Sequence, residues 1–215
     1  MSMKPTVCVV DDDEAVRDSI KVLLEGEGFA VKTYASSQAF LEAYSETSRR
    51  ECPGCLLLDV RMPGMSGLEL QLRIQADGVA IPIIFMTGFG DVPMAVQAMQ
   101  AGAVDFIEKP FRHKVVLDSL RRALEIGEER REEAAMVAEA RTLIENLTER
   151  EREVLARLVQ GQANKVIALE LGISDRTVEV HRKHVMEKLQ ARSLSDVVRI
   201  ALRAGTIPMA GLYSA

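Results

Sequence analysis

The first half of the chain alternates short apolar runs with segments of helical pattern. The apolar runs are rich in β-branched residues and occupy Val7–Val10, Ala30–Tyr34, Cys55–Val60, Pro82–Thr87 and Val104–Ile107. Between them apolar side chains recur at helical spacing, as they do at Val16, Ile20, Leu23 and Leu24. This alternation is typical of βαβ units, and it predicts an α/β domain built on a five-stranded parallel sheet.

The middle of the chain, from Arg112 to about Asn146, has a helical pattern rich in Glu, Arg and Ala. Gly127 interrupts this pattern, and the segment EERREEAA that follows it is strongly charged. We interpret the stretch as the last helix of the first domain running into a helical linker. A disordered charged tether is the alternative, because helix propensity alone is a weak guide.

The last section predicts a small all-α domain. Thr148 and Glu151 form a capping box, in which the threonine oxygen accepts a backbone N–H and the glutamate reaches back. Three or four short helices follow, divided at Gly161, at 172–174 and at 191–193. The predicted organisation is therefore an α/β domain over 1–125, a helical linker over 126–146 and a helical domain over 147–215. Five strands in the first domain match the flavodoxin-like order 2-1-3-4-5.

Charge and composition refine this organisation. No apolar run approaches the roughly 20 residues of a membrane helix, and the N-terminus lacks the layout of a signal peptide. Three cysteines are too few for a disulfide framework, so we expect a cytoplasmic protein without a membrane partner. The net charge of −5 argues against nucleic-acid binding, but residues 146–203 hold 11 Lys/Arg against 8 Asp/Glu, whereas the rest holds 16 against 24. An acidic N-terminal part joined to a mildly basic C-terminal part suggests that the two have different functions.

Polar side chains follow the predicted strands at one end of the sheet. They are Asp11, Asp12 and Asp13 after the first strand, Asp59 after the third, Thr87 at the end of the fourth and Lys109 after the fifth. Neighbouring carboxylates raise one another's pKa, and Mg²⁺, which prefers oxygen ligands, relieves their repulsion. A carboxylate in such a site can attack phosphorus to give an aspartyl-phosphate, while a lysine offsets the charge on the transferring oxygens.

Each of these residues also has an ordinary structural interpretation. Acidic residues after a strand are often placed at a helix start by the macrodipole, which applies especially to Asp13 and Glu14. A lysine at a strand end is often surface, and a threonine there often reflects β-propensity. The combination of all of them at the correct strand ends favours the chemical interpretation.

A second candidate surface lies on a helix that Ser174 caps and that runs from Asp175 to about Gln190. Its inward positions are Val178, Val185 and Leu189, and its outward stripe is Arg176, Glu179, Val180, Lys183 and Glu187. Lysine and arginine suit phosphates or guanine, glutamate accepts from cytosine, and valine contacts a thymine methyl group. Asn164 and Lys165 open the preceding helix, where a backbone phosphate fits. The alternative is a solvated helix face.

Three quoted segments, VVDDDE, LLLDVRMPGMSGLEL and MTGFGDVPMAVQAMQAGAVDFIEKPF, resemble response-regulator receivers over residues 5–125. The resemblance implies that Asp59 is the phosphoacceptor. It implies that Asp12 and Asp59 bind Mg²⁺, with Asp11 nearby and the Arg61 carbonyl as a further ligand. It further implies that Thr87 and Lys109 contact the phosphoryl group, that Lys109-Pro110 is cis, and that Phe106 holds the aromatic switch position.

Residues 147–202 resemble the LuxR-type helix-turn-helix, so the whole chain resembles a NarL/FixJ response regulator. By position, the resemblance makes Glu179, Val180 and Lys183 the base readers. It places Lys165, Arg176, His181 and Arg182 beside phosphates, although His181 can instead be a packed interior histidine. The family's output domain commonly dimerises through its last helix, here Ser195–Arg203.

The expected function is therefore that of a DNA-binding transcriptional regulator and not of an enzyme. A sensor histidine kinase phosphorylates Asp59, the surface 91–107 dimerises, and the paired output domains bind double-stranded DNA and activate transcription, with RNA polymerase a further partner.

Three alternatives stay open. A phosphohydrolase of the haloacid-dehalogenase type would use Asp11 and Asp13, but Ala15 departs from its motif. A docking module would have an output domain that no longer binds DNA. Cys52 and Cys55 have the spacing of a redox C-x-x-C, although they lack its usual place at a helix N-terminus.

Overall fold

The computed structural model describes residues 5–46, 54–88 and 92–206. The chain divides into two compact units, Met1–Arg131 and Glu132–Ala215, each with its own hydrophobic core. The division falls inside one helix, α5 (His113–Glu145). The predicted boundaries at 125 and 146 stay predictions.

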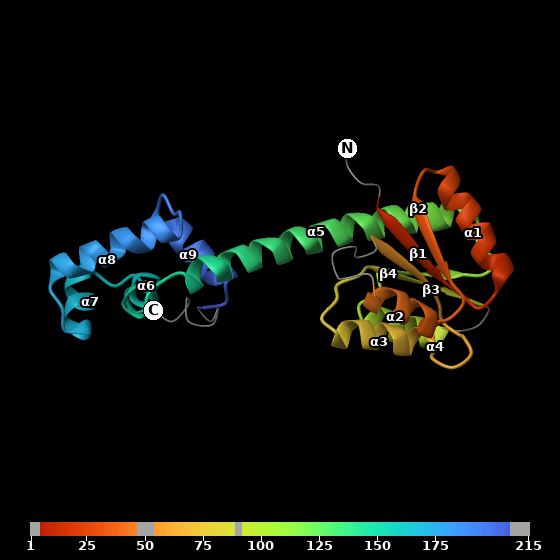
Figure 1. Ribbon diagram of the computed structural model, residues 1–215, viewed down its shortest axis with the longest axis horizontal. Helices are drawn as coiled ribbons and strands as arrows, with labels where there is room; N and C mark the ends of the chain where they lie inside the picture. The colour runs from red at the N-terminus through yellow and green to blue at the C-terminus, as the bar shows by residue number, and fades with distance from the viewer. Residues whose placement is uncertain (1–4, 47–53, 89–91, 207–215) are drawn as a thin grey trace. The chain divides into compact units, whose positions relative to one another are not determined.

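The first unit is built on a sheet of five parallel strands (Figure 1). The strands are β1 (Thr6–Val10), β2 (Ala30–Tyr34), β3 (Cys55–Asp59), β4 (Ile83–Thr87) and β5 (Asp105–Glu108). Their order is β2-β1-β3-β4-β5, which confirms the predicted flavodoxin-like order. Each strand lies within a residue or two of its prediction.

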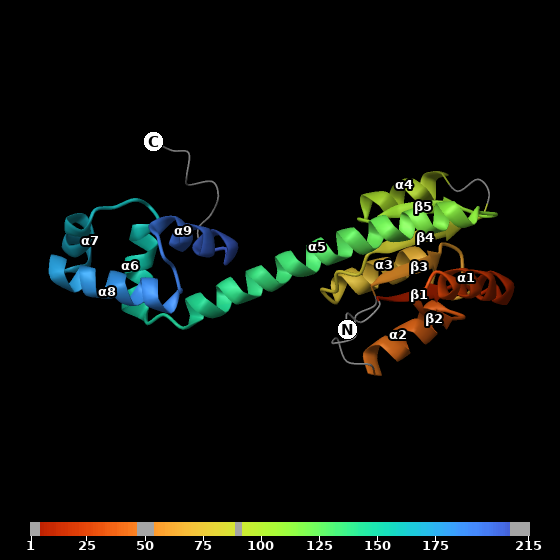
Figure 2. The ribbon, with the colours of Figure 1, turned by 90° about the horizontal axis from the view of Figure 1, so that it is seen from above.

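Helices cover both faces of this sheet. They are α1 (Glu14–Gly26), α2 (Ser37–Glu46), α3 (Gly67–Ala76) and α4 (Val92–Gln100), together with the first half of α5. Alternate residues of β1 point to opposite faces: Val9 belongs to a core cluster with side chains of α1 and α5, and Val10 to one with side chains of α2, α3 and α4. Figure 1 and Figure 2 show α1 and α5 on one face of the sheet and the other three helices on the opposite face. The central strands β3 and β4 are buried along their whole length, as expected for a sheet covered on both faces.

Helix α5 is continuous through Gly127, so the prediction of a helix is confirmed and the expected interruption is wrong. The reason for a glycine here is space. A Cβ atom at Gly127 would lie 2.6 Å from Cγ of Pro82, at the entrance of β4. Gly54 approaches the same helix as closely, because its Cβ would lie 2.9 Å from Cδ2 of Leu124. The two glycines let α5 pack directly against the end of the sheet.

The second unit is helical over its described residues. Its helices after α5 are α6 (Glu149–Leu158), α7 (Asn164–Leu171), α8 (Asp175–Lys188) and α9 (Leu194–Arg203). They are separated at the three predicted breaks, and Gly172 ends α7 in the left-handed conformation with φ of 65°. No helix of the described residues is long and apolar enough to span a membrane.

Glu151 ties the start of α6 to the end of α8. The predicted capping box is present, since Oε2 of Glu151 accepts from the Thr148 backbone N–H at 2.8 Å. The same oxygen accepts from Nζ of Lys188 at 2.7 Å, and Nδ1 of His184 lies 3.7 Å from Oε1. Although burial would raise the pKa of Glu151, its hydrogen bonds with Lys188 and Thr148 lower that pKa to about 2.

We expect Gly127→Ala to destabilise the protein by about 1–3 kcal/mol, because the added methyl group overlaps the rigid ring of Pro82. Helix propensity alone predicts the opposite sign, with a gain of about 1 kcal/mol. Gly26→Ala is the matched control, because a Cβ at Gly26 meets nothing within 4 Å. Urea denaturation of both variants checks the expectation, and an equal gain at the two positions would contradict it.

We expect Glu151→Gln to lower the free energy of unfolding at pH 7 by about 1–3 kcal/mol, because it leaves Lys188 without its charged partner. The folded-state pKa lies below the ordinary value of 4.5, so the contribution is complete above pH 4.5 and is lost as the pH falls toward 2. The difference between wild type and variant should therefore shrink over that range.

Denaturation series at several pH values measure this difference. Glu187→Gln is the control. The carboxylate of Glu187 is exposed, and its ion pair with Nζ of Lys183 is a weak one on the surface, with a separation of 3.7 Å. Its effect should stay below about 0.5 kcal/mol. A pH-independent loss in Glu151→Gln would mean that shape, and not charge, matters at this position.

Candidate functional site

Three carboxylates meet at the carboxyl end of the sheet. Asp11 follows β1 and is fully buried, Asp59 ends β3 and is 6% exposed, and Asp12 is exposed. One oxygen of each lies within 4.8 Å of the others. Asp13, in contrast, caps α1 by accepting from the backbone N–H of Ala15 at 2.9 Å, which confirms its interpretation as a helix-start residue.

Lys109 lies between the two buried carboxylates. Its Nζ donates to Oδ2 of Asp11 at 2.6 Å and to Oδ1 of Asp59 at 2.7 Å. Burial alone would lower the pKa of Lys109, but the two bonds outweigh it and the pKa is raised. Burial raises the pKa of Asp59 despite the lysine, and the charges of Asp11 and Asp12 raise it further. The ammonium group thus balances carboxylates that would otherwise repel one another.

Backbone donors hold the carboxylates in place. Oδ1 of Asp11 accepts from the N–H of Asp13 at 3.0 Å, and Oδ2 of Asp59 accepts from the N–H of Arg61 at 3.2 Å. The Arg61 side chain is exposed. Behind the site, the guanidinium of Arg17 donates to the carbonyl oxygens of Asp11 at 2.8 Å and Asp12 at 3.0 Å. Both Asp11 and Asp59 therefore keep a fixed orientation.

The remaining residues predicted for this site lie on the neighbouring strands. Thr87 ends β4, is 2% exposed, and its hydroxyl donates to the Gly88 carbonyl at 3.3 Å. Phe106 lies in β5, half-buried against the core on the α4 face. The Lys109-Pro110 peptide bond is cis, as the resemblance implies.

The sequence analysis missed two residues that shape this site. Gly67 begins α3 so close to β3 that a Cβ would lie 2.1 Å from the carbonyl oxygen of Asp59. It lies within the quoted segment LLLDVRMPGMSGLEL, so the motif carried a signal for it. Arg17 carried none, because a lone arginine on a helix is ordinary in sequence and becomes informative only when its two carbonyl partners are known.

The second candidate surface is on α8. Val178, Val185 and Leu189 are buried, as predicted, and the whole predicted outward stripe is exposed: Arg176, Glu179, Val180, Lys183 and Glu187. Ser174 caps the helix by accepting from the Thr177 backbone N–H at 3.1 Å. The stripe is thus exposed on a helix whose opposite face packs into the core.

The predicted phosphate-contacting residues divide into two kinds. Lys165 is exposed at the start of α7, whereas Arg182 donates to Oδ1 of Asn164 and so joins α8 to α7. His181 is half-buried, and its Nδ1 is enclosed without a hydrogen-bond partner among the described residues. That nitrogen fits the interior interpretation of His181 better than a phosphate contact.

The cysteines give little support to redox chemistry. Cys52 lies outside the described residues. Cys55 is fully buried in β3, and burial raises the pKa of its thiol well above the ordinary value. A thiol that stays protonated is a poor nucleophile.

Comparisons with known proteins agree with both surfaces. Residues 7–121 match the response regulator receiver domain, and residues 145–201 match the bacterial regulatory proteins of the luxR family. The transcriptional regulatory protein FixJ of Azorhizobium caulinodans is 48% identical over 202 residues, which cover 94% of each chain. The response regulator protein TodT of Pseudomonas putida is 44% identical over 197 residues, covering 92% of this chain and 85% of TodT.

Among solved structures, the response regulator StyR has a TM-score of 0.80 at 45% sequence identity, covering 94% of this chain and all of that one. The first matched range contains the acidic strand ends, and the second contains the exposed stripe of α8. The chain belongs to the NarL/FixJ response regulators: it joins a receiver domain to a luxR-type DNA-binding domain and is a transcriptional regulator, not an enzyme.

Proposed function

We propose that Asp59 accepts a phosphoryl group from a sensor histidine kinase and that this modification controls DNA binding by residues 147–215. The observation that carries the proposal is the position of Lys109, whose ammonium group bonds to Asp59 and Asp11 at once. A lysine held there supplies positive charge where a phosphoryl group on Asp59 would add negative charge.

In the proposed transfer, a carboxylate oxygen of Asp59 attacks the phosphorus of the kinase phosphohistidine. The new O–P bond forms as the P–N bond breaks, and the imidazole leaves. Lys109 then pairs with the phosphoryl oxygens, and the Thr87 hydroxyl donates to one of them. Thr87 ends β4, the neighbour of β3, and Nζ of Lys109 already lies 2.7 Å from Oδ1 of Asp59.

The donor set fits Mg²⁺, because three carboxylates offer oxygen atoms within 4.8 Å and one of these groups is exposed to water. Asp11, Asp12 and Asp59 would hold the ion, with the Arg61 carbonyl as a further ligand. When bound, it supplies charge that offsets the phosphoryl oxygens.

Dimerisation would follow through α4 and β5. As Thr87 turns toward the phosphoryl group, Phe106 moves into the space beside it, and the surface of residues 92–107 becomes competent to pair. This surface presents apolar side chains, since Val96 is 50% and Met99 47% exposed. Residue 91, the first of the predicted surface, lies outside the described residues.

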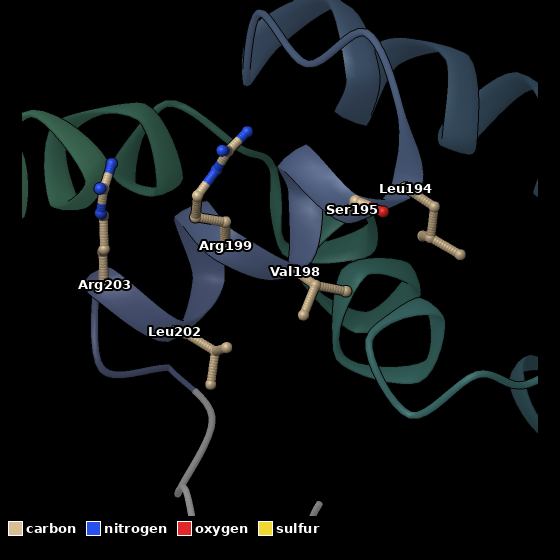
Figure 3. A pocket seen from close by; sticks show the side chains of 6 residues that line it. All are labelled: Leu194, Ser195, Val198, Arg199, Leu202 and Arg203. Atoms are coloured by element: carbon tan, nitrogen blue, oxygen red, sulfur yellow. The ribbon is translucent and has the colours of Figure 1, made fainter.

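The output domains would pair through α9. A hollow of about 460 Å³ on this helix is lined by Leu194, Val198 and Leu202, with Arg199 and Arg203 beside them (Figure 3). Pairing through α9 would present two α8 helices to a two-fold DNA site. Bound there, the dimer would activate transcription, with RNA polymerase as its partner.

We expect beryllofluoride or acetyl phosphate, with Mg²⁺, to modify wild-type protein at Asp59. Asp59→Asn should abolish the adduct because an amide oxygen is a poor nucleophile. Asp13→Asn should keep it, since Asp13 caps a helix outside the acid cluster. Mass spectrometry of acetyl phosphate-treated protein measures the adduct directly, and an undiminished phosphoryl adduct in Asp59→Asn would overturn the assignment.

We expect Lys183→Ala and Lys165→Ala to weaken DNA binding in different ways. If Lys183 reads a base edge, its loss costs about 1–3 kcal/mol on a site selected from random DNA and relaxes preference at one base pair. If Lys165 meets only phosphate, its loss weakens all sequences equally and lowers the salt slope by about 1.

Affinities for matched and scrambled sites over a salt series separate the two roles. Each variant serves as the control for the other, because both remove one exposed lysine from the same domain. Loss of sequence discrimination from Lys165→Ala, with none from Lys183→Ala, would mean that another face of the domain contacts the bases.

A further inference from the structure

Asp12 differs from the other two carboxylates of the acid cluster in how it is held. Both oxygens of Asp11 and both oxygens of Asp59 accept hydrogen bonds, in each case one from Lys109 and one from a backbone N–H. The carboxylate of Asp12 is exposed and accepts no hydrogen bond from the residues that the structure describes. The position of this carboxylate therefore depends on how the backbone of Asp12 is held.

Arg17 holds that backbone. Nη1 of its guanidinium donates to the carbonyl oxygen of Asp11 at 2.8 Å and to that of Asp12 at 3.0 Å. These carbonyls belong to the two planar peptide groups on either side of the Asp12 Cα atom, so one nitrogen restrains both backbone dihedrals of Asp12. Arg17 is half-buried near the start of α1, the helix that Asp13 caps. The guanidinium thus sets the direction in which the Asp12 side chain leaves the loop.

The placement of one carboxylate matters differently for different cations. Mg²⁺ is small and requires oxygen ligands in nearly ideal geometry, whereas Ca²⁺ is larger and accepts a flexible set of ligands at longer distances. Groups that orient a metal ligand, without binding the metal themselves, typically contribute about 10–100-fold to its affinity. A carboxylate that loses its fixed place should therefore cost Mg²⁺ more than Ca²⁺.

We propose that Arg17 is a positioning residue that gives the acid cluster its preference for Mg²⁺ over Ca²⁺. It acts through the backbone of Asp12 and not as a ligand, since a guanidinium group is itself a cation without an acceptor. This inference rests on the Mg²⁺ site of the proposed function and extends it, because it assigns selectivity to a residue outside the ligand set.

Position and charge predict opposite effects for loss of Arg17. Its positive charge opposes the binding of any cation nearby, so removal of the charge alone would strengthen Mg²⁺ and Ca²⁺ binding together. Loss of its two hydrogen bonds instead weakens binding, and weakens that of Mg²⁺ more. The ratio of the two affinities therefore reports the positioning role separately from the charge.

The test is a titration of the ¹⁵N-labelled full-length protein with MgCl₂ and, separately, with CaCl₂, followed at the amide signals of Asp12, Asp13 and Arg61. Arg17→Lys keeps the charge but replaces the planar donor group with a flexible ammonium on a different stem. We expect this variant to bind Mg²⁺ about tenfold more weakly than wild type. Its Ca²⁺ affinity should fall by at most about twofold, because Ca²⁺ tolerates a displaced ligand.

Arg17→Met removes the charge as well and should lower the ratio of Mg²⁺ to Ca²⁺ affinity at least as far, while the lysine variant keeps the test independent of how this one folds. Arg73→Met is the matched control. Arg73 lies on α3, its side chain is 65% exposed, and its ion pair with Asp77 has a separation of 3.7 Å. Its loss should leave both affinities unchanged.

An unchanged affinity ratio in both variants of Arg17 would overturn this inference, whether the two affinities fall together or rise together. A joint rise in Arg17→Met would show that only the charge of Arg17 matters. Absence of a saturable Mg²⁺ shift in the wild-type protein is a different outcome, since it would overturn the proposed Mg²⁺ site and the inference with it.

Discussion

The receiver depends on one constraint: two carboxylates that have lost most of their water share one ammonium group. Asp11 and Asp59 come from strands that are neighbours in the sheet, and Lys109 follows the strand at its edge. Burying a charge without a partner is costly, so the three side chains must be placed together or not at all. The parallel order of the strands achieves this placement by bringing their carboxyl ends to one edge.

Close backbone approaches support that arrangement at both ends of the sheet. At the carboxyl end, Gly67 lets α3 begin against the backbone carbonyl of Asp59. At the amino end, Gly54 lies close to Pro5 and to Leu124 of α5, and Gly127 lets α5 lie against Pro82. A glycine loses more backbone entropy on folding than other residues do, but here its missing side chain lets neighbouring segments pack in direct contact. Helices therefore pack closely against both ends of the sheet, beside Asp59 at one end and beside Pro82 at the other.

The sequence was sufficient for the strands, their order and the helix breaks, because each rests on local periodicity and on turn residues. It also placed Asp11, Asp59 and Lys109 at one edge, because parallel topology converts strand ends into neighbours. It could not find Arg17, whose partners are backbone carbonyls that any sequence possesses. It misjudged Gly127, because a glycine that weakens a helix and a glycine that admits Pro82 look identical in sequence.

The hydrogen bond from Arg182 to Asn164 has a consequence for how the output domain meets DNA. A long arginine side chain normally loses conformational entropy when a complex forms, at a free-energy cost on the order of 1 kcal/mol. Here Asn164 restrains that side chain while the protein is still free, so most of this entropy is lost during folding instead. The same bond keeps the supporting helix aligned with α8. If Arg182 contacts a phosphate, as the sequence predicts, the domain would meet DNA with this side chain already organised, and affinity at the contact would reflect preorganisation as much as new interactions.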